Sequence, residues 1–136
     1  MKVTREQIAR WLNQCPQGWT LDQRELSFAN EKVLVRRIEM ADNYVLEAAA
    51  RYLKGYDCYK KQISIELTLT KWFKSSPKVW SSQGYAKRLT LDENCPRQDF
   101  KRLCNVVMQG NWTDEKLLET YKTAENDTEA FYAQNF

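Results

Sequence analysis

Residues 71–88 hold the residue types that bind a polyanion, and they read KWFKSSPKVWSSQGYAKR. Five of them are basic, four are aromatic and none is acidic. Lysine and arginine neutralise phosphates, and aromatic rings offer flat faces on which unpaired bases stack. The composition of this stretch therefore predicts contact with RNA or single-stranded DNA.

The predicted contact residues are the bases and two of the aromatic residues of this stretch, together with two lysines that precede it. The bases would attract phosphates, and Trp80 or Tyr85 would stack on a base. The complete set is Lys60, Lys61, Lys71, Lys74, Lys78, Trp80, Tyr85, Lys87 and Arg88.

The same residues admit a second interpretation. Exposed Trp and Tyr residues are typical anchors of protein interfaces, and lysines on a hairpin tip or an edge strand limit aggregation. Our first hypothesis is a small, non-enzymatic subunit of a nucleoprotein complex that binds RNA or single-stranded DNA. The alternative is a protein-binding adaptor, or a phage- or plasmid-encoded inhibitor of a larger enzyme, that uses the same loop.

The charge of the chain is unevenly distributed. The net charge is +3, but residues 111–136 carry six acids and two bases, so residues 1–110 carry a net +7. Residues 51–91 contain nine of the bases and only two acids, Asp57 and Glu66. Clustered positive charge attracts phosphates, although many charge clusters are only solvated surface.

The usual residues of catalysis are missing. The chain has no histidine, which is the commonest general acid or base, and its four glycines do not form a phosphate-binding loop. No two of the four cysteines have the C-x-x-C spacing of a zinc or redox site. We therefore expect no enzyme activity, no cofactor and no metal site, and we expect the cysteines to be reduced, partly buried thiols.

The chain shows no feature of membrane insertion or secretion. No apolar run approaches the roughly 18 residues that a membrane helix needs, and the N-terminus MKVTREQIARW has no hydrophobic signal region. These observations predict a cytoplasmic protein that is not bound to a membrane.

Periodicity predicts the elements that position these residues. A helix begins at Thr4, where Gln7 completes a capping box, and ends at Pro16 and Gly18. Alternating apolar residues predict a β-hairpin over 19–40, and the spacing of apolar residues in DNYVLEAAARYLKG predicts a helix over 42–54. Strands are expected over 62–72 and 85–92, and helices over 97–109 and from 113 onward.

These elements predict one α+β domain with a mostly antiparallel sheet and helices on one face, in the order αββαββαα. Residues 1–110 would form its basic core, and the acidic segment 111–136 would form helix that packs on this core or extends from it. Trp11 and Trp19 are expected to pack in or near the hydrophobic core.

The order of GWTL, a hairpin, a helix, the strand ISIELTLT and the later DFKRL is similar to that of pterin carbinolamine dehydratases, which are small α+β enzymes. Those enzymes use a histidine pair after their long helix, where this chain reads YDCYKKQ, and residues 71–95 have no counterpart in them. The resemblance implies at most a similar fold without the enzyme's chemistry, and we do not assign the chain to that family.

Overall fold

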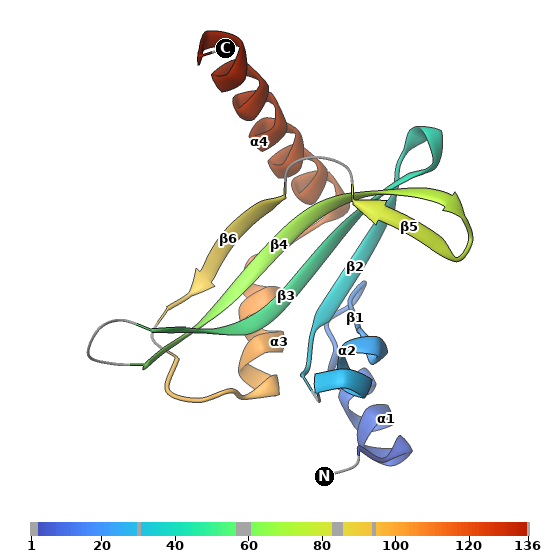
Figure 1. The fold of residues 1–136 in the computed structure, drawn as a ribbon. Helices are drawn as coiled ribbons and strands as arrows, with labels where there is room; N and C mark the ends of the chain where they lie inside the picture. Colours follow the sequence, from blue (N-terminus) through green and yellow to red (C-terminus); the bar gives the residue numbers. More distant parts are fainter. Residues whose placement is uncertain (1–2, 30, 57–60, 83–85, 94, 136) are drawn as a thin grey trace. The chain divides into compact units, whose positions relative to one another are not determined.

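The computed structural model describes residues 3–29, 31–56, 61–82, 86–93 and 95–135 (Figure 1). These residues form an α+β fold with a six-stranded antiparallel sheet and four α-helices, so the predicted fold class is confirmed. The helices are α1 (Arg5–Gln14), α2 (Gln23–Ala29), α3 (Phe100–Gln109) and α4 (Asp114–Asn135), with a short 3-10 turn η1 (Ala41–Asn43). The strands are β1 (Thr20–Leu21), β2 (Leu34–Glu39), β3 (Tyr44–Tyr56), β4 (Lys61–Ser76), β5 (Val79–Ser82) and β6 (Lys87–Asp92).

The sheet has the strand order β1-β2-β3-β4-β5, and β6 pairs with β4. β5 pairs with the last residues of β4, from Trp72 to Ser76. Shortly after β6, the backbone N–H of Cys95 donates to the carbonyl of Ile63 near the start of β4. The long strand β4 therefore pairs with β5 at its end and bonds to the segment leading to α3 near its start.

The chain divides into two compact units, each assembled from three segments. Unit 1 comprises Met1–Arg36, Ala49–Leu67 and Leu89–Asn111, and unit 2 comprises Arg37–Ala48, Thr68–Arg88 and Trp112–Phe136. Strands β2, β3, β4 and β6 pass from one unit into the other. The division of the chain into a core and an acidic segment at residue 110 stays a prediction.

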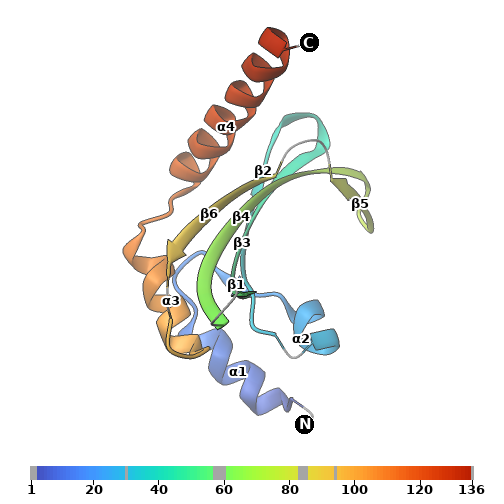
Figure 2. The same cartoon turned by 60° about the vertical axis from the view of Figure 1, so that its left-hand side comes forward.

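Unit 1 places α1 and α3 side by side (Figures 1 and 2). The ring of Trp11 on α1 meets Phe100 on α3 edge-on, with their centroids 6.5 Å apart. The hydroxyl of Tyr52 on β3 donates to the carbonyl of Asp99, the N-cap of α3, over 2.8 Å. The buried apolar side chains of this unit are Trp19, Leu21, Leu26, Val33, Leu34, Val35, Ala49, Ala50, Tyr52, Ile65, Leu67, Cys95, Phe100, Leu103, Cys104 and Val107.

The predicted start of α1 is confirmed. Thr4 caps the helix, its side chain accepts from the backbone of Gln7, and the side chain of Gln7 accepts from the backbone of Thr4. The two hydrogen bonds between Thr4 and Gln7 supply partners to two backbone donors that a helix end leaves free.

Of the two N-terminal tryptophans, Trp19 is 7% exposed, whereas Trp11 is half-buried at the edge of the core.

The prediction of a helix over 42–54 is wrong, because these residues form most of strand β3. Of the apolar side chains that suggested a helical face, Val45, Ala48 and Ala49 are 7% exposed or less. Leu46 and Ala50, which lay off that face, are fully buried as well, so side chains are buried on both sides of the sheet. A strand covered on both faces loses the alternation of apolar and polar residues by which strands are recognised. Pairing with β2 and β4 therefore outweighs the helix preference of the alanines.

The predicted hairpin over 19–40 is correct only in its second strand, β2. Its first strand is limited to Thr20–Leu21, and Gln23–Ala29 form helix α2 instead. The side chain of Asp22 accepts from the backbone N–H of Arg24, and the Leu26 N–H donates to the Asp22 carbonyl. Asp22 thus provides a helix start that competes successfully with the short alternation around Leu26.

The strand predicted over 62–72 lies within β4, and the strand predicted over 85–92 is β6 in the residues that are described. The helix predicted over 97–109 begins at Phe100, where Asp99 caps it, and α4 continues from Asp114 to Asn135. No helix among the described residues is long and apolar enough to cross a membrane.

Unit 2 has a smaller core. Its strands contribute Ile38, Val45, Leu46, Ala48 and Leu69, and α4 contributes Leu117, Tyr121 and Ala124. Burial raises the pKa of the Tyr121 hydroxyl to about 12, and the nearby carboxylate of Glu125 adds to this effect. The buried side chains of Leu117, Tyr121 and Ala124 thus pack the first half of α4 into the core of unit 2, the unit that carries the β4–β5 hairpin.

Candidate nucleic-acid interface

The β4–β5 hairpin carries the centre of the predicted binding stretch. Its strands are antiparallel, with Lys74 directly opposite Trp80 and Phe73 opposite Ser81. Between Lys74 and Ser76 the register shifts, and Pro77 and Lys78 form the turn. An irregularity of this kind bends the strand and strengthens its twist. Figure 2 shows β5 folded back along the end of β4.

Trp80 lies beside two cationic side chains of unit 2. The ammonium of Lys74 is 5.3 Å from the centre of the Trp80 ring, and the guanidinium carbon of Arg37 is 5.5 Å from it. Residues directly opposite each other in an antiparallel pair point to the same face, so Lys74 and Trp80 share one face of the hairpin. The indole is half-buried, because its cationic neighbours cover part of it.

Lys71 belongs to the other face of β4, because successive side chains of a strand alternate. Its ammonium lies 4.5 Å from the ring centre of Tyr44, and that ring lies 5.3 Å from the ring of Phe73. The structure therefore separates Lys71 from Lys74, although the sequence grouped them. Each face of the hairpin carries an aromatic residue next to a cation.

The hairpin tip is the most exposed part of this region. Lys78 is exposed and its backbone N–H donates to the Ser76 hydroxyl over 3.4 Å. The hydroxyl of Ser75 donates to the carbonyl of Val79 over 3.3 Å, and the Val79 side chain is 57% exposed. Lys78 is therefore available to a partner, and the next residue, Val79, presents an apolar side chain to solvent.

Trp80, Lys74, Arg37 and Glu47 form a cluster through their mutual contacts. The remaining predicted residues are not part of this cluster. Lys87 lines a shallow hollow of about 380 Å³ together with residues of α4, two of which, Glu119 and Asp127, are acidic. Arg88 is exposed at the start of β6. Lys60 and Tyr85 lie outside the described residues. Lys61 begins β4, but its side chain lies outside what is described.

Two residues of the cluster were not in the predicted set. Arg37 on β2 approaches Trp80, and its Nε donates to Oε2 of Glu47 on β3 over 3.0 Å. The alternation of residues 33–38 predicts the strand on which Arg37 lies. No local pattern links it to a tryptophan on a strand three positions away in the sheet.

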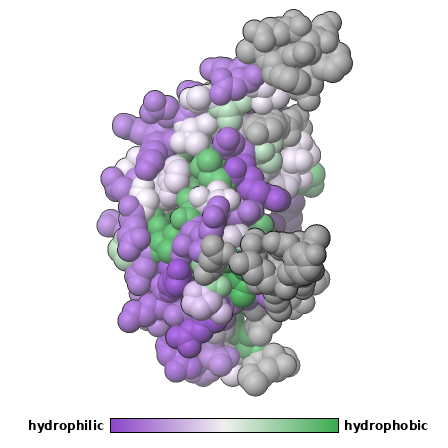
Figure 3. Space-filling view, turned by 90° about the vertical axis from the view of Figure 1, so that its left-hand side faces the viewer, coloured by the Kyte–Doolittle hydropathy of each residue, from purple (hydrophilic) through white to green (hydrophobic). Residues whose placement is uncertain are grey.

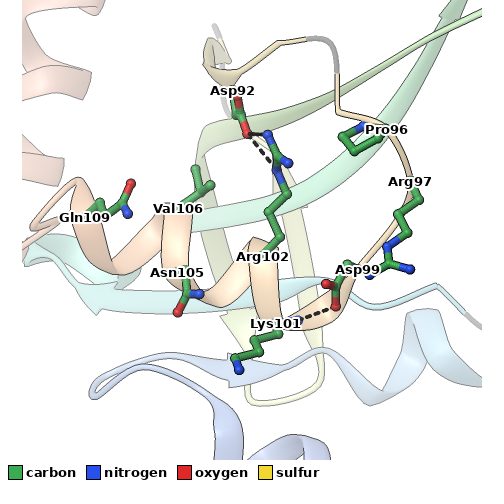
Figure 4. Close-up of a pocket in the computed structure, with 9 residues that line it drawn as sticks. All are labelled: Asp92, Pro96, Arg97, Asp99, Lys101, Arg102, Asn105, Val106 and Gln109. Atoms are coloured by element: carbon green, nitrogen blue, oxygen red, sulfur yellow. Dashed lines mark hydrogen bonds and ion pairs between the residues drawn. The ribbon is translucent and has the colours of Figure 1, made fainter.

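A second hollow, of about 460 Å³, lies beside α3 in unit 1 (Figure 4). Its most prominent cation, Arg102, extends toward Asp92 and donates to one carboxylate oxygen through Nε (3.0 Å) and Nη2 (2.7 Å). The side chain of Asp99 accepts from the backbone of Lys101. Arg102 is thus engaged inside the protein and offers little to a ligand. The lining residues of this hollow also include no aromatic ring on which a base could stack, so it is a weaker candidate than the hairpin.

The thiols do not form a reactive site in the described part of the chain. Cys15, Cys95 and Cys104 are free, and Cys58 lies outside the described residues. Burial raises the pKa of the Cys104 thiol to about 12, which opposes the thiolate that a nucleophile requires. Among the same residues, no group of three or more Cys, Asp or Glu side chains is arranged to hold a metal ion.

One side of the molecule is shown by its hydropathy in Figure 3. Hydrophilic residues cover much of that side, and apolar residues form separate patches between them. Among the side chains that the structure describes, the large apolar ones that stand out as exposed are Val79 on the hairpin and Met108 on α3. The hairpin therefore combines cations, an aromatic ring and an exposed apolar side chain.

Comparison with protein-family models, with curated proteins and with solved structures finds no match for this chain. The similarity to pterin carbinolamine dehydratases also weakens with the fold, because β3 occupies the place where the order of elements required a helix. The hairpin itself is therefore the basis on which a function can be inferred.

Proposed function

We propose that this chain is a non-enzymatic protein that binds RNA or single-stranded DNA through the β4–β5 hairpin, as a small subunit of a nucleoprotein complex. The observation that carries the proposal is the position of Lys74 and Arg37, 5.3 and 5.5 Å from the ring of Trp80. A nucleotide joins a flat base to a phosphate within a few bonds. An indole with cations at its side matches both parts.

The charge of the hairpin supports the same proposal. Residues 67–91 contain no acid, and three of their lysines fall on the second half of β4 and the turn that follows it: Lys71, Lys74 and Lys78. Each phosphate that they neutralise would release condensed counterions and so favour binding. Because Lys71 and Lys74 lie on opposite faces, a strand that follows the Trp80 face would contact Lys74 and Lys78 first.

The proposal predicts a preference for unpaired bases. Stacking requires a base whose face is accessible, and stacking on an aromatic side chain is worth about 1–3 kcal/mol per base. In a duplex both faces of an internal base are covered by its neighbours. Duplex of the same length should therefore bind more weakly than single strands at equal salt concentration.

The test is a titration of a fluorescent 12-nucleotide single strand at several salt concentrations. The variants Lys74→Ala and Lys78→Ala should each reduce the log–log salt slope by about 0.7. Lys122→Ala, which removes an exposed lysine of α4, is the matched control and should leave the slope unchanged. Trp80→Leu should lower the affinity without changing the slope, and Trp80→Phe should retain most of the affinity.

A protein partner is the second candidate function, and the exposure of Val79 favours it. An apolar side chain that is 57% exposed beside a tryptophan suits the centre of a protein contact. An adaptor or enzyme inhibitor of this type predicts that Val79→Ser disrupts a protein complex recovered from lysate. Nucleic-acid binding predicts that Val79→Ser leaves oligonucleotide affinity unchanged. Absence of oligonucleotide binding at low salt would rule out the first function.

A further inference from the structure

Arg37 connects three strands of unit 2. Its backbone lies on β2, its Nε donates to Glu47 Oε2 on β3 over 3.0 Å, and its guanidinium carbon lies 5.5 Å from the Trp80 ring centre on β5. The Arg37 side chain is 35% exposed, and that of Glu47 is 15% exposed. The guanidinium is therefore held in place while part of it still reaches solvent.

The contact between Arg37 and Trp80 joins two strands that are not neighbours in the sheet. β3 and β4 lie between β2 and β5, so in a flat sheet β2 and β5 would be roughly 14 Å apart, at about 4.8 Å for each neighbouring pair. The bulge between Lys74 and Ser76 turns the tip of the hairpin, and two long side chains span what remains of this separation. The Arg37 guanidinium thus lies against the face of the hairpin that carries Trp80 and Lys74.

We propose that Arg37 is a further nucleic-acid contact of this interface, and that Glu47 is the residue that positions it; this inference rests on the proposed function of the hairpin. A guanidinium has five N–H donors in one plane. Glu47 accepts from Nε, so the N–H groups of the outer nitrogens that face away from the carboxylate suit the oxygens of a phosphate. Trp80 lies next to the group, with its ring centre 5.5 Å from the guanidinium carbon.

The geometry requires arginine rather than any cation at position 37. Lysine carries its charge on a single nitrogen and has no planar group, so a carboxylate and an indole cannot orient it in the same way. Arg37→Lys should therefore weaken binding of the single strand about tenfold, within the range of a hydrogen bond to a charged group. Arg37→Ala should have at least this effect and should also reduce the salt slope by about 0.7, because one phosphate contact is lost.

Glu47 provides the decisive variant, because its charge and its positioning role predict opposite results. If only charge mattered, removal of a carboxylate near bound phosphates would increase the affinity. If Glu47 positions Arg37, Glu47→Ala should reduce the affinity severalfold even though a negative charge is removed. Glu47→Gln keeps an acceptor for Arg37 Nε and removes the charge, so it should bind at least as tightly as the unmodified protein.

A matched control exists in unit 1. Arg51 and Glu31 form an ion pair at 4.0 Å with side chains 30% and 31% exposed. Arg51→Lys and Glu31→Ala repeat the same chemical changes in the other unit and should leave oligonucleotide affinity unchanged. Circular dichroism and thermal melting of every variant separate a loss of binding from a loss of fold, and Arg37→Lys keeps the charge if Arg37→Ala does not fold.

Three results would overturn the inference in distinguishable ways. If the unmodified protein binds and Arg37→Ala binds equally well with the same salt slope, Arg37 is no contact and the function of the hairpin stands without it. If Arg37 is required but Glu47→Ala binds more tightly, the positioning role of Glu47 is wrong. If the unmodified protein does not bind the single strand even at low salt, both the inference and the proposed function are wrong.

Discussion

Arg102 on α3 donates two hydrogen bonds to a single carboxylate oxygen of Asp92, the last residue of β6, at 3.0 and 2.7 Å. This pair joins the first turns of α3 to the end of the sheet within unit 1. The thiol of Cys95 lies 3.6 Å from the same oxygen. The hydrogen bond from Arg102, together with its charge, holds the pKa of Asp92 below the ordinary value.

This pair predicts a pH-dependent contribution to stability. A carboxylate whose pKa is lowered in the folded state stabilises the fold above its unfolded pKa of about 4, and the contribution is lost as the pH falls through the folded pKa. Arg102→Met should raise the pKa of Asp92, as measured by NMR titration. The melting temperature of this variant should be lower than that of the unmodified protein at neutral pH, and the gap should close in acid. Arg97→Met, which removes an exposed arginine of the same hollow, should show no such gap.

The sequence predicts the elements whose pattern is local and fails where distant pairing decides. The capping box at Thr4 and the alternation of Ile65, Leu67 and Leu69 depend on neighbouring residues, and both predictions are confirmed. The alanine-rich segment of β3 satisfies a helical period by chance, and only its neighbours β2 and β4 make it a strand. Long-range pairing of this kind cannot be seen in a window of a dozen residues.

The candidate site shows the same division. The cationic and aromatic residues of the hairpin are adjacent in sequence, so Lys74 and Trp80 could be predicted together. Arg37 and Glu47 come from strands that precede the hairpin, and only the folded sheet brings them near it. Alternation also separates Lys71 from Lys74, which a count of charges along the sequence does not reveal.

The backbone conformation at Gly18 disfavours any residue with a side chain. Its φ is +87°, a left-handed conformation, and an added Cβ would lie 2.9 Å from Nη1 of Arg36. Gly18→Ala should therefore cost about 1 kcal/mol or more in the free energy of unfolding, measured by urea denaturation. Gly110, with a φ of −70°, adopts an ordinary conformation at the end of α3. Gly110→Ala is the control, and a similar loss at both positions would contradict the conformational explanation.

The two N-terminal tryptophans should differ in their contribution to stability. Trp19 is 7% exposed, so Trp19→Ala should cost about 3–5 kcal/mol. Trp11 is half-buried, with Phe100 at 6.5 Å and the ammonium of Lys32 over its ring at 4.4 Å. Trp11→Ala should cost less, about 1–3 kcal/mol. Chemical denaturation of both variants gives the comparison, and an equal loss would mean that Trp11 is more deeply packed than its exposure indicates.

The buried thiols of unit 1 should be protected from alkylation. Cys104 is 4% exposed and Cys95 is 6% exposed, and burial raises the pKa of both thiols, that of Cys104 to about 12. Alkylation requires the thiolate, so both residues should react with iodoacetamide far more slowly in the native protein than in urea. Peptide mass spectrometry after timed alkylation measures each cysteine separately.

The same shift in Cys104 predicts how stability changes at high pH. A thiol whose pKa is raised by folding contributes stability that is complete below its unfolded pKa of about 8.5 and is lost as the pH rises toward its folded value. Cys104→Ala removes this dependence, so the difference in melting temperature between this variant and the unmodified protein should shrink as the pH rises from 8 to 11. A difference that stays constant over this range, together with rapid alkylation of native Cys104, would show that the thiol is not buried as described.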